Sequence, residues 1–279
     1  MILVADSGAS KTAWRLIRKD GSIEQYETTG FNPYYQSGEQ LDRDVSEALA
    51  PRVDTDIAQI FYYGSGCSSD NNKKIIHDIL GRHFTNAEIE VSHDLLAAAR
   101  ALCGHKPGIA CILGTGANSC YFDGQHIVEN VTSLGYVLGD EGSGAWFGKV
   151  LIADYLRKDL PQGLADRFTK RFGLDRNAVL DRVYHQEMPG RFLAGFARFI
   201  FQNIKDPWCY RLIYDGFSLF FDKNVMKYAQ VDKVPVHFTG SIAFYFSNIL
   251  RQVANDKGVV LKNIVEGPIA GLTLFHQKS

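Results

Sequence analysis

The chemistry that this sequence could perform begins at an acidic residue, Asp6, and at the turn of small residues 8–10 that follows it. Residues 2–5 are apolar and alternating polarity resumes at Thr12, which predicts two strands joined by a tight hairpin. Small side chains leave the backbone N–H groups of such a turn free to converge on an anion. A carboxylate beside an anion is useful when a cation such as Mg²⁺ lies between them. We therefore expect a phosphate-binding hairpin, although the same residues could simply turn the chain.

A P-loop is the competing interpretation of this stretch, because Ser10-Lys11-Thr12 resembles the end of that motif. A P-loop requires a glycine directly before the lysine and a helix after the motif. Here a serine precedes the lysine, and Asp20-Gly21 indicates a turn between strands. The sequence therefore favours a hairpin over a P-loop.

A second acid, Asp94, follows a predicted strand over residues 87–91 and precedes strong helix formers over residues 95–102. In open α/β sheets ligands lie beyond the carboxyl ends of the strands, so a catalytic carboxylate is expected at Asp94. The structural alternative is that Ser92 or Asp94 caps the helix, and the two roles can coexist. His93 is interpreted as a structural residue.

The pattern of the opening recurs in the middle of the chain. Residues 109–113 are apolar, residues 114–119 form a turn of small residues, and residues 120–122 are again extended. Three strands, a helix, a strand, a helix, a strand and a helix precede this point, and the same order then begins again. The repetition predicts two halves of related topology with a cleft between them.

A glycine-rich turn over residues 139–144 follows the second hairpin. It contains three glycines with Asp140 and Glu141, and it lies between a predicted loop over residues 133–138 and a predicted helix over residues 145–156. Acids are favoured in the first turn of a helix by its dipole, which is the structural explanation. Three glycines instead indicate backbone that passes close to a ligand.

A third junction of strand, glycine and helix lies near the end of the chain. The predicted strand 235–239 runs into residues 240–243, before a predicted helix over residues 244–254. Such a junction suits a phosphate or a planar ligand. The aromatic-rich helical region 161–230 is interpreted as core.

Composition excludes several classes of function. The chain has 279 residues, 46% of them hydrophobic, and a formal net charge of −1. It lacks the basic field that nucleic acid or an acidic membrane surface would attract, and it has no apolar stretch of membrane-spanning length and no leader-like N-terminus. We expect a cytoplasmic protein with no nucleic-acid or membrane partner. The cysteines are scattered and are interpreted as reduced thiols. They are Cys67, Cys103, Cys111, Cys120 and Cys209.

Taken in order, these features resemble the actin, hexokinase and Hsp70 ATPase superfamily, and within it the N-acetylglucosamine kinase branch, which groups with the BadF-type ATPases. The resemblance is most specific at residues 114–119 and 139–143. It implies an α/β fold with two ribonuclease-H-like, actin-like ATPase domains and a central cleft. The implied domains are residues 1–104 with a returning helix at 268–279, and residues 105–267 with a helical insertion.

The resemblance also implies an activity. The chain would be an ATP-dependent phosphotransferase with an alcohol acceptor, a sugar kinase that phosphorylates N-acetylglucosamine or a related amino sugar at O6. Its cofactors would be ATP and Mg²⁺, and it would form a homodimer.

Individual roles follow from the same resemblance. Asp94 would be the catalytic base, and Asp6 would hold Mg²⁺ through water. The residues implied to bind ATP are Asp6, Gly8, Ala9, Ser10, Lys11, Thr12, Thr115, Gly116, Gly240, Ser241 and Ala243. The residues implied to bind the sugar are Asn32, Asp94, Ala117, Asn118, Ser133, Leu134, Gly135 and Asp140.

Two other functional classes share this fold. ATP-driven activators of 2-hydroxyacyl-CoA dehydratases or aryl-CoA reductases use cysteines to hold an iron–sulfur cluster between subunits. Cys67 has no cysteine partner at suitable spacing, which favours the kinase. A nucleotide-regulated binding or polymerising protein is the third class, and Asp94 and Asn32 oppose it only if they face the cleft.

Overall fold

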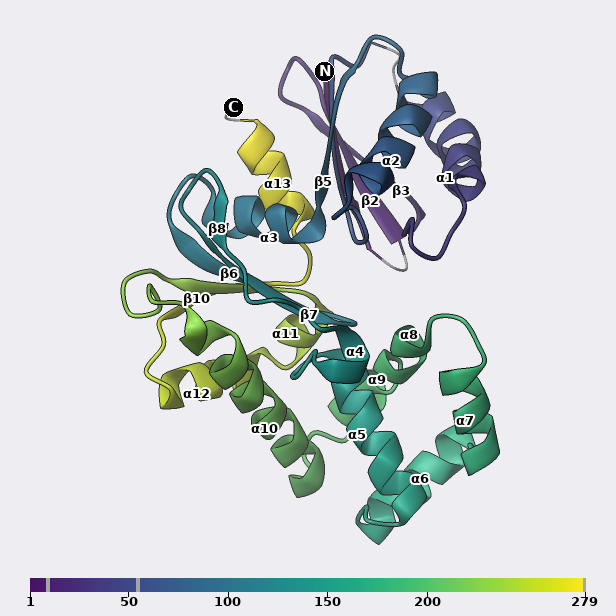
Figure 1. The fold of residues 1–279 in the computed structure, drawn as a ribbon, viewed down its shortest axis with the longest axis vertical. Helices are drawn as coiled ribbons and strands as arrows, with labels where there is room; N and C mark the ends of the chain where they lie inside the picture. Colours follow the sequence, from purple (N-terminus) through teal and green to yellow (C-terminus); the bar gives the residue numbers. More distant parts are fainter. Residues whose placement is uncertain (9–10, 54–55, 278–279) are drawn as a thin grey trace. The chain divides into compact units, whose positions relative to one another are not determined.

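Two five-stranded sheets organise the chain, and each combines parallel and antiparallel pairs of strands (Figure 1). The structure is a computed structural model that describes residues 1–8, 11–53 and 56–277. Contacts divide the chain into a first unit, Met1–His105 with Gly267–Ser279, and a second unit, Lys106–Glu266. The α/β class is therefore confirmed. None of the described helices is long and apolar enough to cross a membrane.

The sheet of the first unit consists of β1 (Ile2–Ser7), β2 (Lys11–Ile17), β3 (Ile23–Thr29), β4 (Gln59–Gly64) and β5 (Glu88–His93), in the order β3-β2-β1-β4-β5. β1 pairs antiparallel with β2, so the predicted pairing of these strands is confirmed. β1 also pairs in parallel with β4, and β4 pairs in parallel with β5. The carboxyl ends of β1, β4 and β5 therefore meet at one edge of the sheet.

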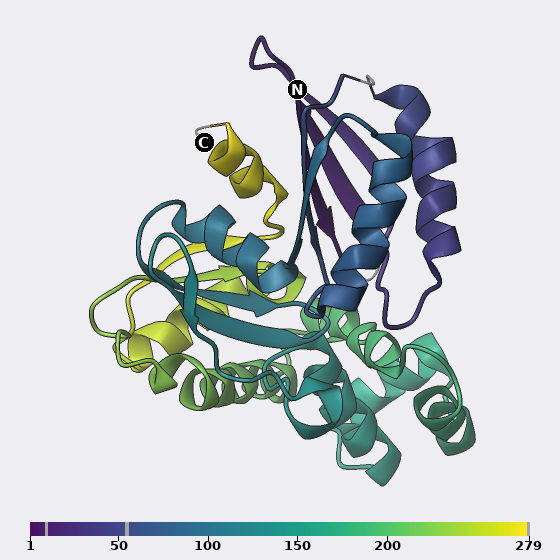
Figure 2. The same ribbon diagram turned by 45° about the horizontal axis from the view of Figure 1, so that its top comes forward.

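The helical segments of the first unit are α1 (Gly38–Asp44), η1 (Val45–Leu49), η2 (Ala50–Arg52), α2 (Asp70–His83), α3 (Asp94–Cys103) and α13 (Ile269–His276). α1 and α2 cover one face of the sheet, where Leu3 and Trp14 are buried (Figure 2). α3 and α13 cover the other face, where Val4 and Tyr63 are buried with Ala97. The successive apolar residues of β1 supply both faces, because side chains alternate along a strand.

Hydrogen bonds between polar side chains connect α13 to the rest of this unit. The hydroxyl of Tyr63 and Nε2 of His276 lie 2.9 Å apart, and Arg100 donates to the Tyr63 hydroxyl at 2.5 Å. Burial lowers the pKa of His276 to about 4, so this imidazole is neutral at physiological pH. A Cβ at Gly271 would lie 2.4 Å from the carbonyl oxygen of Ala101, so glycine allows α13 to approach α3 closely.

The second unit repeats the topology of the first. Its sheet consists of β6 (Gly108–Leu113), β7 (Ala117–Phe122), β8 (Ile127–Glu129), β9 (Val236–Thr239) and β10 (Leu261–Val265), in the order β10-β9-β6-β7-β8. β6, β7 and β8 are antiparallel neighbours, whereas β6, β9 and β10 pair in parallel. The recurrence predicted from the sequence is confirmed.

The helical segments of the second unit are α4 (Gly135–Leu138), α5 (Gly144–Arg157), α6 (Gln162–Phe172), α7 (Arg176–Tyr184), α8 (Pro189–Ala194), α9 (Ala197–Gln202), α10 (Pro207–Lys223), η3 (Val225–Lys227), α11 (Ser241–Tyr245) and α12 (Ser247–Asp256). The interpretation of the aromatic residues as core is confirmed for Phe168, Phe199, Phe217 and Phe220, each at most 2% exposed.

Two local predictions for the second unit are wrong. The expected loop 133–138 contains the one-turn helix α4, whose short length leaves no periodic signal. The expected single helix 244–254 is divided between α11 and α12. The break falls at Phe246, whose buried ring packs against Phe147 and Phe201.

Candidate active site

Two carboxyl groups lie at the same edge of the first sheet. Asp6 is the penultimate residue of β1, and Asp94 directly follows β5. β4 lies between these two strands, with Gly64 in register with both Ser7 and His93. The sequence predicted a ligand edge at the carboxyl ends of the strands, and the topology brings both acids to it.

The environment of Asp94 suits a base that titrates near neutrality. Burial raises its pKa to about 6, while the backbone N–H of Leu95 opposes the shift. The expected helix cap is supplied by neither Ser92 nor Asp94. Instead, Nδ1 of His93 accepts from the N–H of Leu96 at 3.3 Å. Asp94 is therefore not needed as the cap of α3, and His93 has the structural role that was predicted.

The pKa of Asp6 is raised to about 7, chiefly by burial and further by the negative charge of Asp94. Lys11 opposes this shift, although its Nζ pairs with Glu27 at 3.2 Å on an exposed part of the hairpin. A nearby cation stabilises the ionised form of a carboxyl group whose pKa is raised in this way. Asp6 is therefore a buried carboxyl group whose ionised form a nearby cation would stabilise.

The rest of the first hairpin divides into accessible and buried parts. Gly8 is exposed, and a Cβ there would have only the Lys11 carbonyl oxygen nearby, at 3.8 Å. Thr12 is buried, and its hydroxyl lies 2.8 Å from the Ser7 hydroxyl and donates to the Thr29 carbonyl at 3.1 Å. The Thr12 side chain therefore holds the hairpin together. The predicted contacts of Ala9 and Ser10 lie outside the described residues.

Asn32 is held beside the turn that follows β4. Its Oδ1 accepts from the N–H of Tyr34 at 3.0 Å, and its own N–H donates to Oε1 of Gln36 at 2.8 Å. Gly66 has φ +82°, and a Cβ there would lie 2.3 Å from Oδ1 of Asn32. The side-chain carbonyl group of Asn32 is thus fixed, and within the described part of the chain no hydrogen bond engages its side-chain amide nitrogen.

In the second unit, Asp140 joins the glycine-rich turn to the turn between β6 and β7. Its Oδ1 accepts from the N–H of Ala117 at 3.2 Å and from the hydroxyl of Ser133 at 3.4 Å. A Cβ at Gly116 would lie 2.9 Å from Oδ2 of Asp140, so a larger residue at this position would displace the Asp140 carboxylate. Burial raises the pKa of Asp140, and these two hydrogen bonds oppose the shift. Asp140 also has φ +57°, in the left-handed region that residues other than glycine adopt uncommonly, although aspartate does so more readily than most.

The other residues predicted for the second hairpin lie close to Asp140 in the fold. Thr115 is exposed, and its carbonyl accepts from Ala145 at 3.0 Å. Oδ1 of Asn118 accepts from Ser119 at 2.9 Å and from Nδ2 of Asn130 at 3.0 Å. The predicted sugar contacts at Leu134 and Gly135 are exposed, at the start of α4.

A long-range ion pair that sequence patterns could not indicate supports this turn. Nζ of Lys223, at the end of α10, lies 2.5 Å from Oε1 of Glu141. Gly142, which follows Glu141 in the chain, has φ +77°, and a Cβ there would lie 3.0 Å from the carbonyl oxygen of Gly216. Glu141 is therefore structural, and close packing against α10 explains one of the three glycines without a ligand.

The backbone conformation and close packing at position 240 explain the glycine there, in addition to its predicted contact with ATP. The φ of Gly240 is +114°, and a Cβ there would lie 2.2 Å from the carbonyl oxygen of Leu113. Next to it, Ser241 is exposed at the start of α11, whereas Ala243 is buried. Ser241 is therefore the accessible side chain of this junction.

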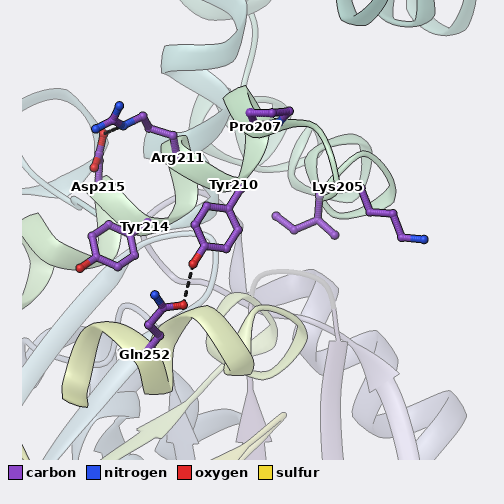
Figure 3. Close-up of a pocket in the computed structure, with 8 residues that line it drawn as sticks. Lys205, Pro207, Tyr210, Arg211, Tyr214, Asp215 and Gln252 are labelled. Atoms are coloured by element: carbon purple, nitrogen blue, oxygen red, sulfur yellow. Dashed lines mark hydrogen bonds and ion pairs between the residues drawn. The ribbon is translucent and has the colours of Figure 1, made fainter. Parts of the chain in front are cut away.

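A separate hollow of about 600 Å³ lies in the second unit, where α10 faces α12 (Figure 3). Its lining includes the stacked rings of Tyr210 and Tyr214, and the Tyr210 hydroxyl donates to Oε1 of Gln252 at 2.6 Å. None of the predicted site residues lines it.

Comparisons with known proteins identify the family. The putative N-acetylglucosamine kinase of Porphyromonas gingivalis has 38% identity and a TM-score of 0.94, over 100% of this chain and 99% of that chain. The putative N-acetylglucosamine kinase of Chromobacterium violaceum has 20% identity and a TM-score of 0.77, over 98% of both chains. The ROK hexokinase of Thermus thermophilus shares the fold, with 15% identity and a TM-score of 0.56 over 98% of this chain and 97% of that chain. No family model and no curated protein sequence matches the chain.

The full-length match at 38% identity and the two sheets of related topology agree with the resemblance inferred from the sequence. The chain belongs to the sugar kinase family of the actin-like ATPase superfamily.

Proposed function

We propose that this protein transfers the γ-phosphoryl group of ATP to a hydroxyl of N-acetylglucosamine or a related amino sugar, at O6. The observation that carries the proposal is the pair of acids at one edge of the first sheet, Asp94 and Asp6, both with raised pKa values. Buried carboxyl groups at a ligand edge, with pKa values raised towards neutrality, are candidate functional residues. The sugar is suggested by the names of two similar proteins, those of Porphyromonas gingivalis and Chromobacterium violaceum.

Asp94 is the residue that would accept the proton of the attacking hydroxyl. The hydroxyl oxygen forms a bond to the γ-phosphorus while the bond to the bridging oxygen of ADP breaks, and the proton passes to the Asp94 carboxylate. Phosphoryl transfer depends mostly on positioning and charge neutralisation. A positioned base therefore supplies only part of the rate, about 10²- to 10⁴-fold, or roughly 3–5 kcal/mol of barrier.

The residues of the first hairpin fit ATP and Mg²⁺. Burial and the charge of Asp94 disfavour an ionised Asp6, and a bound cation would reverse that effect. Gly8 is exposed and carries no side chain to obstruct a phosphate. We propose that Asp6 holds Mg²⁺ through water and that the hairpin holds the β- and γ-phosphates. When bound, the metal would neutralise charge on the phosphates.

We propose that the sugar is recognised by polar side chains that hydrogen bonds already hold in place. Asn32 would use its amide nitrogen, because its Oδ1 is already engaged. Asn118 and Asp140 are further candidates, and hydrogen bonds fix both of their side chains. Fixed polar groups favour the ligand that matches them, since any mismatch leaves a group unpaired.

The position of Cys67 favours the kinase over the iron–sulfur activator. Its side chain is fully buried in the core of the first unit, and burial raises the pKa of the thiol to about 12. A ligand of a cluster shared between subunits needs an accessible thiolate.

The pH dependence of the reaction is expected to report the base. Because a protonated Asp94 cannot accept a proton, the sugar kcat/KM should fall about tenfold per pH unit below a pKa of about 6. The measurement is ADP release at saturating MgATP and limiting sugar from about pH 4.5 to about pH 8. A rate that stays level through the acidic range would remove Asp94 from this role.

A screen of acceptors tests the proposed function. ADP release is measured with hexoses, hexosamines and N-acyl hexosamines, and N-acetylglucosamine or a close relative should give the highest kcat/KM. ATP hydrolysis that no sugar accelerates would contradict the kinase. Activity with plain hexoses alone would leave a sugar kinase but contradict the amino-sugar substrate.

A further inference from the structure

The turn after β4, residues 64–67, lies between the strands that carry the two acids. Gly64 is in register with Ser7 on one side and with His93, the neighbour of Asp94, on the other. The backbone N–H of Ser65 donates to the Ser7 carbonyl at 3.0 Å. Ser65 is thus held at the sheet edge where Asp6 and Asp94 lie.

The next residue of the turn, Gly66, contacts the side chains of two other residues. Asn72 donates through Nδ2 to the Gly66 carbonyl at 2.8 Å, and Gly66 lies directly against Oδ1 of Asn32. The turn therefore lies against Asn32, and its first residue, Gly64, is in register with the residue that precedes Asp94.

Unlike the other polar groups described for this turn, the Ser65 hydroxyl is not held by a hydrogen bond within the described chain. Its Oγ is buried but has no hydrogen-bond partner among the described residues. A buried hydroxyl without a partner costs roughly 1–3 kcal/mol, so most such groups are paired. Its neighbours at the sheet edge are the residues proposed to handle phosphate and the attacking hydroxyl. An unpaired donor at this sheet edge is a candidate for a hydrogen bond to a bound ligand.

We propose that Ser65 contacts the substrate, its hydroxyl donating a hydrogen bond to the phosphoryl group as that group moves from ADP to the sugar hydroxyl. The inference rests on the proposed kinase function and adds a residue to that site. Ser65 follows the strand that lies between those of Asp6 and Asp94, so a phosphoryl group that moves between the proposed metal site and the proposed base is the ligand group expected beside it. It keeps its proton throughout, while Asp94 takes the proton of the sugar.

The test is Ser65→Ala in the full chain, with N-acetylglucosamine and MgATP as substrates. A donor that acts in the transition state should lower kcat by at least about tenfold on removal, with little change in either KM. Ser65→Thr keeps the hydroxyl and should recover part of the rate. A KM for sugar that rises while kcat stays constant would overturn the assignment to the phosphoryl group.

Stability separates this role from a structural one. Because the hydroxyl has no partner in the described chain, Ser65→Ala should melt at the wild-type temperature or above it. Ser68→Ala is the matched control, since Ser68 is exposed on the next turn and its hydroxyl lies 3.1 Å from that of Tyr34. A destabilised Ser65→Ala, or one with wild-type kcat, would refute the inference. Absence of sugar phosphorylation by the wild type would instead refute the proposed function.

Discussion

Asp94→Asn is expected to lower the kcat of sugar-dependent ADP release by about 10²- to 10⁴-fold. Asparagine keeps the shape of the side chain but cannot accept the proton of the attacking hydroxyl. Affinity for MgATP should be retained, since the proposed phosphate contacts lie on β1 and its hairpin. Steady-state kinetics and a binding titration of MgADP measure the two quantities. Unchanged turnover would show that Asp94 is not the base.

Because His93 is the N-cap of α3, the effect of Asp94→Asn on kcat can be separated from an effect on the helix cap. The change at Asp94 leaves the Nδ1 cap of His93 in place, and the Oδ1 of an asparagine can still accept from the N–H of Leu95. Asp70 supplies a matched control, as it is the first residue of α2 in the same way that Asp94 is the first residue of α3. Asp70 is exposed and forms a 3.7 Å surface ion pair with Lys73, so Asp70→Asn should leave kcat at the wild-type value.

Asp6→Asn should lower the activity of the enzyme but raise the stability of the ligand-free protein. Loss of the metal-site carboxylate is expected to weaken the magnesium dependence of nucleotide binding and to lower kcat by at least about 10²-fold. Titration of MgADP against ADP alone, read by calorimetry, measures the first effect. An Asp6→Asn variant with wild-type magnesium dependence would remove Asp6 from the metal site.

The stability effect follows from the raised pKa of Asp6, about 7 in the folded chain. A carboxyl whose pKa is higher in the folded state destabilises that state as pH rises above the unfolded value of about 4, and fully so above the folded value. The ligand-free Asp6→Asn variant should therefore melt above the wild type at about pH 8 and close to it near about pH 4. Equal melting temperatures at the alkaline pH would contradict a strained Asp6 carboxylate. Such a gain in stability with a loss of function is typical of active-site residues.

Local pattern was enough to predict much of this molecule. The apolar run before Asp6 and the alternation after Thr12 predicted the β1 and β2 pair, because strand periodicity is read directly from side chains. The helix formers after Asp94 predicted α3, whereas the returning helix that corresponds to α13 was implied by the family resemblance. The position of Asp94 after a parallel strand was enough to bring it to the sheet edge with Asp6.

Features that depend on tertiary contacts could not be predicted. The Glu141 and Lys223 ion pair joins residues 82 positions apart, and no spacing rule connects them. Glycines at positions 142 and 240 are explained by the close approach of Gly216 and Leu113, which only the fold reveals.

Other features had a local signal that was ambiguous. Imidazole is an uncommon helix cap, so Ser92 and Asp94 were the expected candidates in place of His93. The glycines on either side of Ser65 marked a turn, but only burial showed its hydroxyl to be unpaired among the described residues.

Phosphorus NMR of the reaction with N-acetylglucosamine and MgATP tests the central claim most directly. The proposed kinase predicts a phosphate monoester signal that grows with ADP and is split by the methylene protons of C6. The signal should be absent at comparable enzyme concentration and time with Asp94→Asn. Consumption of ATP to inorganic phosphate alone, with no sugar phosphate from N-acetylglucosamine or any other amino sugar, would contradict the account.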